Sequence, residues 1–270
     1  MKAADKLQHL IWKTKLYKIT HPYLHWGLRY VCPFCGFHSS GYAKCGEDSE
    51  LFSRIHVIGA GRRSAACWKC NCRDRERLLY VYLRDIVHVF DSSRKFHILH
   101  FAPEPHLTER LRTLANVNYI CGDLFTTGYS YPDYVRNMNV LDIPFKENSF
   151  DIVLCNHVLE HIENDQKAMQ ELYKVLKKTG IAILQVPIAS DLAHTYENSS
   201  ITEPELRIKH FGQKDHVRLY GMDYKTRLES VGFKVDMVNI ADRYPKYGLN
   251  PFETLYICCL LYTSDAADDM

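Results

Sequence analysis

From residue 95 onward, short apolar runs alternate with segments of helical periodicity, and this alternation limits the fold more than any other feature. The apolar runs predict seven strands, at 96–101, 117–121, 139–142, 151–156, 181–186, 233–238 and 254–260. Helical patterns fall at 106–114, 165–176 and 223–231, and Gly180 and Gly232 are expected to end the last two. Strands that alternate with helices build a sheet covered on both faces, so we predict an α/β fold with a doubly wound, Rossmann-like sheet. Its ligand should lie at the carboxyl ends of the central strands.

Two CxxC pairs, Cys32/Cys35 and Cys67/Cys70, precede this region in a glycine-rich segment. Four thiolates on two tight turns suit a tetrahedral structural Zn²⁺, so we expect a small zinc-ribbon-like module over residues 31–73. A lost or redox-labile site is the alternative, because Cys72 offers a rival ligand and Cys45 lies between the pairs.

The rest of the chain divides around these two regions. Residues 1–30 contain a basic amphipathic helical pattern that fits either a peripheral contact with an anionic membrane or packing on the protein itself. Residues 74–94 should form a connecting helix, and 95–260 the α/β domain. Residues 261–270 turn small and acidic and resemble a non-native tail.

Charge and apolar content indicate which kinds of partner to expect. Lys plus Arg number 34 against 32 Asp plus Glu, so no global field favours nucleic acid or a membrane surface as the main partner. The longest apolar runs fall far short of a membrane span, and the basic first 30 residues lack the apolar core of a signal peptide. We therefore expect a cytoplasmic protein.

The stretch from Val140 to Pro187 resembles the central and later motifs of class I S-adenosylmethionine-dependent methyltransferases. It contains LDIPF, the strand FDIVLCN, the turn HVLEH, a helix, KKTG and the strand IAILQVP. With the segments LHFAPEP, DHVRLYG and GF, the chain from about Cys32 to Cys258 is similar to a bacterial branch that carries a cysteine ribbon before the methyltransferase domain. The resemblance implies seven strands in the order 3-2-1-4-5-7-6, with S-adenosylmethionine lying over strands 1 and 4.

The first strand departs from the family pattern. It ends in FAPEP, from Phe101 to Pro105, where the family has a glycine-rich turn. Two prolines remove two N–H donors, which a dinucleotide pyrophosphate would need and a sulfonium amino acid would not. We assign Phe101, Ala102 and Glu104 to the cofactor loop. Glu104 either meets the methionyl end of the cofactor or is an exposed loop residue.

Other residues at strand ends suit the remaining parts of the cofactor. Asp123 follows the second strand, where a carboxylate can accept hydrogen bonds from both ribose hydroxyls. By resemblance, Asp142 meets the adenine amino group and Ile143 packs on the ring, while Asn156 and His157 lie where methyl donor meets acceptor. Turn or helix-capping aspartates are the alternative for the two acids.

Two histidines are candidate bases. His157 follows the fourth strand, and His216 lies in the polar segment 205–221 between strands five and six. A structural network of Asp215, His216 and Arg218 is the alternative. HVLEH also matches the HxxEH metal signature, with His157 and His161 as ligands and Glu160 as base, which leaves a metal hydrolase as a remote alternative.

The sequence thus predicts methyl transfer from S-adenosylmethionine to an oxygen or nitrogen acceptor, with zinc structural only. Family association suggests a glycan or small metabolite as acceptor. The alternative from another class is a zinc-ribbon nucleic-acid-binding protein, catalytic or not, that uses a local basic cluster. Its residues would be Arg62, Arg63, Arg73, Arg75 and Arg77.

Overall fold

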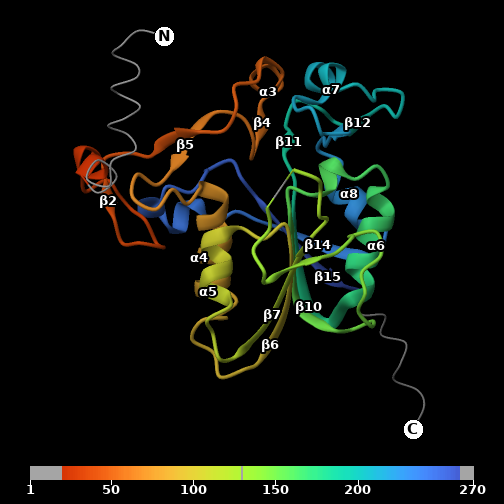
Figure 1. The fold of residues 1–270 in the computed structure, drawn as a ribbon, viewed down its shortest axis with the longest axis horizontal. Coiled ribbons are helices and arrows are strands. Elements are labelled where there is room, and N and C mark those ends of the chain that lie inside the picture. Colours follow the sequence, from red (N-terminus) through yellow and green to blue (C-terminus); the bar gives the residue numbers. More distant parts are fainter. Residues whose placement is uncertain (1–19, 129, 262–270) are drawn as a thin grey trace.

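A sheet of seven strands forms the centre of the computed structural model, which describes residues 20–128 and 130–261 (Figure 1). The strands are β6 (Phe96–Phe101), β7 (Val117–Asp123), β8 (Val135–Asn137), β9 (Phe150–Asn156), β10 (Leu176–Gln185), β14 (Phe233–Val238) and β15 (Leu255–Leu260). They lie in the order β8-β7-β6-β9-β10-β15-β14, which is 3-2-1-4-5-7-6 along the chain and confirms the expected topology. β15 runs antiparallel to both of its neighbours, and the other pairs are parallel.

Alternating side chains of the central strands enter two cores. Ile98 of β6 and Ile152 of β9 face one core, while the next residues, Leu99 and Val153, face the other. This period of two is what a strand buried on both faces produces. Helices α4 (Asp74–Asp85) and α5 (Pro105–Leu111) cover one face, and α6 (Asp165–Val175) and α8 (Tyr224–Glu229) cover the other (Figure 1).

The third strand is the clearest error of the sequence prediction. β8 spans Val135–Asn137, whereas the predicted strand, 139–142, is a turn closed by a bridge between Asn139 and Asp142. The apolar side chains in and beside this turn, such as Ile143, are buried in the core. Burial of a turn gives the same apolar signal as a short strand, so the pattern alone pointed to the wrong segment.

Gly180 was predicted to end a helix, but the structure places it within β10. α6 ends at Val175, and Leu176 already has extended backbone angles. The register of β10 against β9 shifts between Leu176 and Ile181, and a Cβ on Gly180 would come within 2.9 Å of the Asp151 carbonyl. The glycine therefore serves close packing at a strand irregularity. Gly232, at φ +107°, does follow the end of α8 as predicted.

The segment before α4 is built of very short elements. They are η1 (His21–His25), β1 (Tyr30–Val31), β2 (His38–Ser39), β3 (Ala43–Cys45), α3 (Glu50–Arg54), β4 (Val57–Ile58) and β5 (Arg63–Ala66). β4 pairs with β11 (Ile188–Ala189), which follows the sheet strand β10, and Phe34 and Phe37 share the core beneath α4. We call residues 30–73 the cysteine module. It is packed onto the sheet domain at two places.

The remaining elements lie near the carboxyl ends of the central strands and after β14. They are η2 (Leu159–His161), β12 (Tyr196–Glu197), α7 (Pro204–Phe211), β13 (Arg218–Leu219), η3 (Ala241–Arg243) and η4 (Pro245–Tyr247). In the described ranges, 20–128 and 130–261, no helix is long and apolar enough to cross a membrane. Most of the predicted N-terminal helix and nearly all of the 261–270 tail lie outside the described residues.

Candidate active site

The ends of β6, β7 and β9 meet at one edge of the sheet. Phe101, the last residue of β6, pairs in register with Gly122 and Cys155, so the chain positions that follow each strand lie side by side. Asp123 ends β7 and Asn156 ends β9. The structure therefore brings together the predicted cofactor residues at these three strand ends.

Two turns at this edge hold non-glycine residues in left-handed backbone conformation. Ala102, directly after β6, has φ +48°, and His157, directly after β9, has φ +55°. The Ala102 amide donates to the Gly122 carbonyl at 3.0 Å, which holds the first turn against β7. Such conformations cost of order 1 kcal/mol or more and concentrate at functional sites. Ala102 has the smallest side chain that tolerates this turn and leaves its outer surface open.

Asn156 is buried with unused hydrogen-bonding capacity. It is 3% exposed, and neither polar atom of its amide has a partner among the described residues. A buried amide without partners costs about 1–3 kcal/mol, so this position suits a polar ligand group. Nearby, Asp123 is half-buried, and burial raises its carboxyl pKa while the Leu124 amide and His161 oppose the shift.

Glu104 is buried rather than exposed on its loop. Its carboxylate lies 2.7 Å from His100 Nε2, and His100 Nδ1 lies 2.8 Å from the Tyr119 hydroxyl, which in turn contacts Thr108. Burial alone would raise the pKa of Glu104, but the neighbouring His100 lowers it below its usual value. The carboxylate thus helps to fix the turn after β6 from within the protein.

The two residues predicted to contact adenine, Asp142 and Ile143, have side chains in different surroundings. Asp142 is exposed in the turn that follows β8. Ile143 is 2% exposed and belongs to the core shared with α6, and its amide approaches Glu171 at 3.3 Å. An adenine ring could contact the Ile143 side chain only if that side chain left the core.

A cavity of about 590 Å³ separates the cysteine module from the sheet domain. Its walls include a loop of the module around Gly59, which has φ +87°. A Cβ at Gly59 would lie 3.6 Å from His157 Cε1, which is van der Waals contact, so the module loop lies directly against this histidine. We call this cavity the cleft. The lining residues used below are Arg63, Arg73, Arg75, His157, Glu160, His161, Asp215 and His216.

Three histidines surround Glu160 inside the cleft. Its Oε1 lies 3.4 Å from His157 Nδ1 and 4.0 Å from His161 Nε2, and the rings of His161 and His216 meet edge to face. Burial alone would raise the pKa of Glu160, but the hydrogen bond from His157 and the nearby imidazole charges lower it to about 2. Burial lowers the pKa of His157 and His216, so both favour the neutral form at pH 7. Both predicted catalytic histidines thus lie in one cleft.

The HxxEH segment does not form the hydrolase arrangement. Residues Leu159–His161 make a single 3-10 turn, and His157 precedes it in a left-handed conformation. The two histidines are therefore not successive ligands on one face of an α-helix, as that alternative requires. Glu160 instead joins His161 and His216 as a group of close donor atoms.

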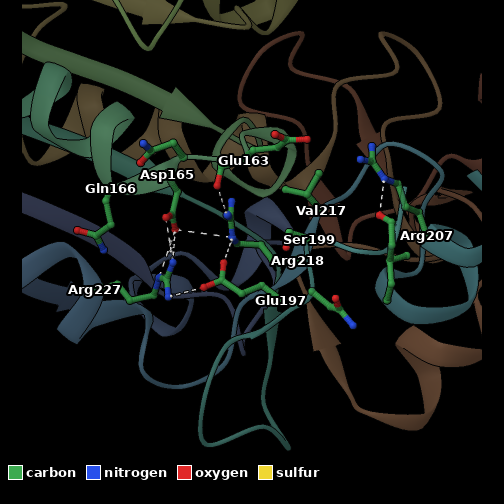
Figure 2. Close-up of a pocket in the computed structure, with 12 residues that line it drawn as sticks. Glu163, Asp165, Gln166, Glu197, Ser199, Arg207, Val217, Arg218 and Arg227 are labelled. Atoms are coloured by element: carbon green, nitrogen blue, oxygen red, sulfur yellow. Dashed lines mark hydrogen bonds and ion pairs between the residues drawn. The ribbon is translucent and has the colours of Figure 1, made fainter. Parts of the chain in front are cut away.

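A second cavity, of about 770 Å³, lies beside the start of α6 (Figure 2). Its charged side chains pair with one another: Arg227 contacts Asp165 at 2.8 Å and Arg218 contacts Glu197 at 2.8 Å. Arg218 also donates to the carbonyl of Leu159, which ties the β13 strand to η2. Arg218 therefore has a structural role, but its partners are not Asp215 and His216, as the network alternative had it; those two residues line the cleft.

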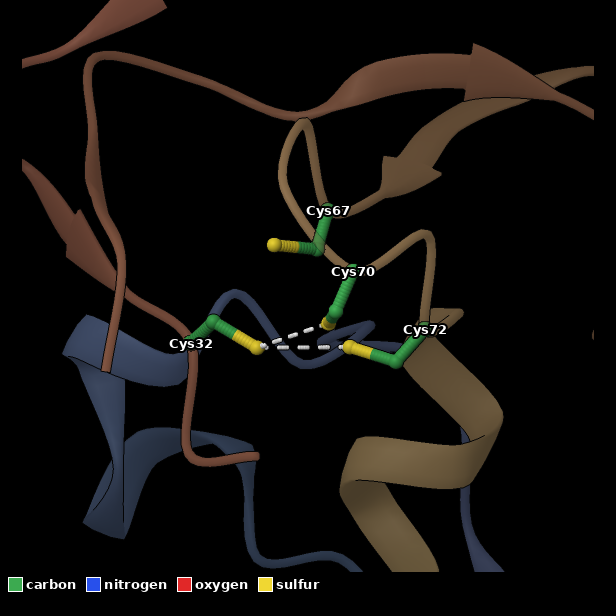
Figure 3. Close-up of side chains that lie close together, drawn as sticks. All are labelled: Cys32, Cys67, Cys70 and Cys72. Atoms are coloured by element: carbon green, nitrogen blue, oxygen red, sulfur yellow. Dashed lines mark hydrogen bonds between the residues drawn. The ribbon is translucent and has the colours of Figure 1, made fainter. Parts of the chain in front are cut away.

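Five cysteines cluster in the module, and Figure 3 shows four of them, Cys32, Cys67, Cys70 and Cys72. Cys32 Sγ lies 3.3 Å from Cys72 Sγ and 3.7 Å from Cys70 Sγ, and Cys35 Sγ lies 3.7 Å from Cys67 Sγ. A disulfide bond needs about 2.05 Å, whereas sulfurs around tetrahedral Zn²⁺ are about 3.8 Å apart. The spacing fits a thiolate–zinc site. The set of four within 4.8 Å of one another includes Cys72 in place of the predicted Cys35.

The two CxxC turns repeat one backbone pattern. Cys32 and Cys67 each accept a hydrogen bond from the amide four residues on, at Gly36 and Asn71. Both acceptor turns end in a residue of positive φ, 67° and 63°. The repeat equates Cys35 with Cys70, so Cys35 and Cys72 remain alternative fourth ligands on geometric grounds.

Two residues of the site were not predicted as cofactor or catalytic residues, although Arg75 was predicted as part of the basic cluster. Glu253, in the loop before β15, is buried near Gly59 with one carboxylate oxygen unpartnered in the described chain, and burial raises its pKa to about 7. Arg75 lines the cleft, and its Nε is buried and likewise unpartnered there. Both lie outside recognisable motifs, so only the fold reveals their position.

Comparisons with known proteins agree with this architecture. Residues 106–184 match the family model described as a methyltransferase domain. Two uncharacterized proteins of Methanocaldococcus jannaschii align with the chain, at 40% identity over 75 residues and 44% over 45 residues. These alignments cover 27% and 17% of this chain but only 33% and 22% of the relatives. The chain thus spans a third or less of the relatives' length.

The chain is also similar to solved structures of low sequence identity. A SAM dependent methyltransferase from Archaeoglobus fulgidus is 15% identical with a TM-score of 0.41, over 68% of this chain and 93% of that chain. The cyclase SpnF is 14% identical with a TM-score of 0.46, over 90% and 93%. The family match itself spans α5 to β10 and includes Asp123, Asn156 and His157. Residues 106–184 thus match a methyltransferase domain, and the strand order 3-2-1-4-5-7-6 is the one that the resemblance to class I S-adenosylmethionine-dependent methyltransferases implied.

Proposed function

We propose that this protein transfers a methyl group from S-adenosylmethionine to an oxygen or nitrogen atom of a small acceptor held in the cleft. The observation that carries this proposal is the position of His157. It follows β9 directly, at the predicted cofactor edge of the sheet, and it also lines the cleft between the sheet domain and the cysteine module. Methyl donor and acceptor could therefore meet beside one side chain.

The residues at the strand ends fit the cofactor. Asp123 offers a half-buried carboxylate for the ribose hydroxyls, and Asn156 offers an unpartnered buried amide for the methionyl end. Ala102, between these strand ends, adds only a methyl group to the turn after β6. When bound, the sulfonium supplies an electrophilic methyl carbon and a good leaving group.

The protein's own part in the step is alignment, exclusion of water and removal of one proton. An electron pair of the acceptor atom forms the new bond to the methyl carbon, and the pair of the carbon–sulfur bond goes to sulfur. The acceptor proton passes to His157 Nε2, which is buried and has no partner in the described chain. Because burial favours the neutral imidazole, His157 can accept that proton near pH 7.

The cleft supports a small-molecule or sugar acceptor over a nucleic acid. Its volume of about 590 Å³ lies in the range typical of small-ligand sites. The basic cluster that suggested nucleic-acid binding is partly internal, because Arg77 is fully buried and Arg63 is paired with Asp74 at 2.6 Å. Those two side chains are not free to contact phosphates.

We also propose one structural Zn²⁺ in the cysteine module. The thiols are spaced for tetrahedral coordination, and Arg77 lies 3.8 Å from Cys72 Sγ. Four thiolates around Zn²⁺ carry a net negative charge, which the buried guanidinium would compensate. Zinc here supports the wall of the cleft and takes no part in the transfer.

Calorimetric titration with S-adenosylhomocysteine, the product of the donor, tests the proposal without knowledge of the acceptor. Asp123→Ala removes two charge-assisted hydrogen bonds of about 1.5–3 kcal/mol each at most, so binding should weaken roughly tenfold to several hundredfold. Asp236→Ala, an exposed aspartate on β14, is the matched control and should bind like wild type.

Two outcomes would contradict this proposal in different ways. A Kd of 1 mM corresponds to a binding free energy of roughly 4 kcal/mol. If the wild-type protein binds neither S-adenosylhomocysteine nor the methyl donor at about 1 mM, the methyltransferase function fails. If the wild type binds and Asp123→Ala binds as tightly as Asp236→Ala, the placement of the ribose is wrong.

A further inference from the structure

Three side chains in the cleft form a set of metal ligands that the transfer step above does not use. Glu160 and His161 come from η2, and His216 precedes β13. One donor atom of each lies within 4.8 Å of the others, and all three residues line the cleft. They converge from two segments 55 residues apart in the chain, by their numbering from 161 to 216.

The spacing is close to that of a bound ion. Donor atoms in neighbouring positions around a metal with bonds of about 2.1 Å lie roughly 3.0–3.4 Å apart. The group is wider than this, with donor atoms within 4.8 Å of one another, so the side chains would move closer together on binding one ion. The backbone positions are already fixed, because the Val217 amide donates to the Glu160 carbonyl at 2.9 Å.

His161 is oriented as a metal-binding histidine usually is. Its Nδ1 lies 3.2 Å from the Asp215 carbonyl oxygen and 3.5 Å from the Asp215 carboxylate. Both neighbours accept, so Nδ1 carries the proton and Nε2 presents its lone pair, 4.0 Å from Glu160 Oε1. A backbone or carboxylate acceptor on the second nitrogen is the common support of a ligating imidazole.

Glu160 provides an independent reason to expect a cation. The residue is 2% exposed, and its Oε2 has no hydrogen-bond partner in the described chain. Within 4.0 Å, its ion-pair partners among those residues are the imidazoles of His157 and His161, with no Lys or Arg. A buried carboxylate with an unused oxygen and no permanent countercharge is costly, and a divalent ion would satisfy both needs.

We propose that Glu160, His161 and His216 bind a divalent transition-metal ion whose open coordination positions face the cleft and accept an oxygen atom of the acceptor. Two imidazoles and one carboxylate suit Mn²⁺, Fe²⁺, Co²⁺ or Zn²⁺ better than Mg²⁺ or Ca²⁺, which prefer oxygen ligands alone. Metal binding by these residues stands by itself, whereas the acceptor role rests on the function proposed above. It narrows the acceptor atom to a hydroxyl oxygen.

The chemistry of a metal-bound hydroxyl agrees with a hydroxyl oxygen as the acceptor atom. A hydroxyl bound to a divalent cation loses its proton more readily, and the ion also orients its oxygen. The proton then passes to His157 Nε2, the oxygen electron pair forms the bond to the methyl carbon, and the carbon–sulfur pair leaves with sulfur. No oxidant or reductant enters this balance.

Titration with Mn²⁺ of the full chain loaded with a single equivalent of zinc tests the site, because the soft thiolates take that zinc and leave the cleft free. Mn²⁺ prefers nitrogen and oxygen ligands and binds thiolates weakly, so it should leave the cysteine module alone. Electron paramagnetic resonance should count one bound Mn²⁺ per chain in addition to zinc. Water proton relaxation should report at least one exchangeable water on the bound ion, because three protein ligands leave positions open.

Single-ligand variants locate the ion. His216→Ala and His161→Ala should each weaken Mn²⁺ binding by tenfold or more. His194→Ala is the control, since that side chain is 88% exposed and lies outside the group. His161 is partly exposed, so its variant tests the site even if removal of the buried His216 disturbs folding; thermal unfolding of each variant checks this.

The proposal is overturned if zinc-loaded wild type binds no Mn²⁺ at millimolar concentration, if the bound ion carries no exchangeable water, or if folded His161→Ala binds as tightly as His194→Ala. S-adenosylhomocysteine titration separates this result from the proposed function. Mn²⁺ binding without binding of that product would keep the metal site and remove the methyltransferase activity. The reverse pattern would keep the activity and remove the metal.

Discussion

Arg77 joins the cysteine module to the sheet domain through one buried guanidinium. It is fully buried and donates to four carbonyl oxygens, those of Ala65, Cys72, Tyr247 and Gly248, at 2.9–3.0 Å. Two of these carbonyls belong to the module and two to the segment before β15. The guanidinium also lies over the ring of Tyr42, 3.9 Å from its centroid.

Arg77→Lys keeps the charge but loses the planar fork that reaches both segments at once. An ammonium on a shorter reach can serve one side, which leaves about two buried carbonyls unpaired. Each unpaired group costs about 1–3 kcal/mol, so the free energy of unfolding should fall by about 2–6 kcal/mol. For a protein of this size, each kcal/mol lowers Tm by roughly 2 °C or more, which gives a decrease of about 4–12 °C.

Urea denaturation followed by circular dichroism measures this change on zinc-loaded protein. Arg112→Lys is the matched control, because Arg112 is exposed and pairs with Glu109 on the surface of the same domain. Its effect should stay within about 0.5 kcal/mol. One ordinary hydrogen bond contributes about 1 kcal/mol. If the free energy of unfolding of Arg77→Lys lies within about 1 kcal/mol of wild type, the four carbonyl hydrogen bonds do not hold the module to the sheet domain as we infer.

Three further predictions follow from single features. Gly212→Ala should destabilise the protein by about 2–4 kcal/mol in the same assay, because φ is +83° and the new Cβ would overlap the Phe52 ring. Burial would raise the pKa of Asp151, but the hydrogen bond from Lys177 helps to lower it below 3.8. The stability lost in Asp151→Asn should therefore be full above about pH 4 and shrink as pH falls from there through the lowered pKa; a difference that stays constant or grows below about pH 4 would contradict this. Chelation of zinc should expose residues 31–73 to proteolysis while the central strands stay protected, and equal protection of the module in metal-free protein would argue against a zinc site.

Periodicity predicted the sheet well because burial on both faces leaves a distinct sequence signal. β6 and β14 match the predicted ranges, 96–101 and 233–238, residue for residue. This periodicity gave wrong predictions where buried residues do not form a strand, or where strand residues are not buried. In the turn 139–142, Val140 and Leu141 are apolar because they lie in or beside the core, whereas Lys177, Lys178 and Thr179 are polar although they belong to β10. A hydrophobic pattern predicts which side chains are buried. It predicts the backbone hydrogen bonds of a strand only where those bonds accompany burial.

The candidate site was predictable where a residue immediately follows a strand. Asp123, Asn156 and His157 could be placed at one edge because parallel strands align their carboxyl ends. Glu253 and the module loop at Gly59 could not, since their position depends on how β4 pairs with β11 far along the chain. Contacts between distant segments of low periodicity leave no local signal.

The cysteine module explains why a methyltransferase domain of this shape would need a metal far from its chemistry. The proposed cofactor residues lie at strand ends of the sheet, which two cores stabilise, one of them shared with Phe34 and Phe37 of the module. The module-side wall of the cleft consists instead of short strands and glycines, at Gly46, Gly59 and Gly61, with little core of their own. Such a wall keeps its shape only if its ends are tied down. The thiol cluster and Arg77 tie one end, and the β4–β11 pair ties the other. Zinc would thus act on acceptor binding through the order of this wall, and only weakly on binding of the cofactor.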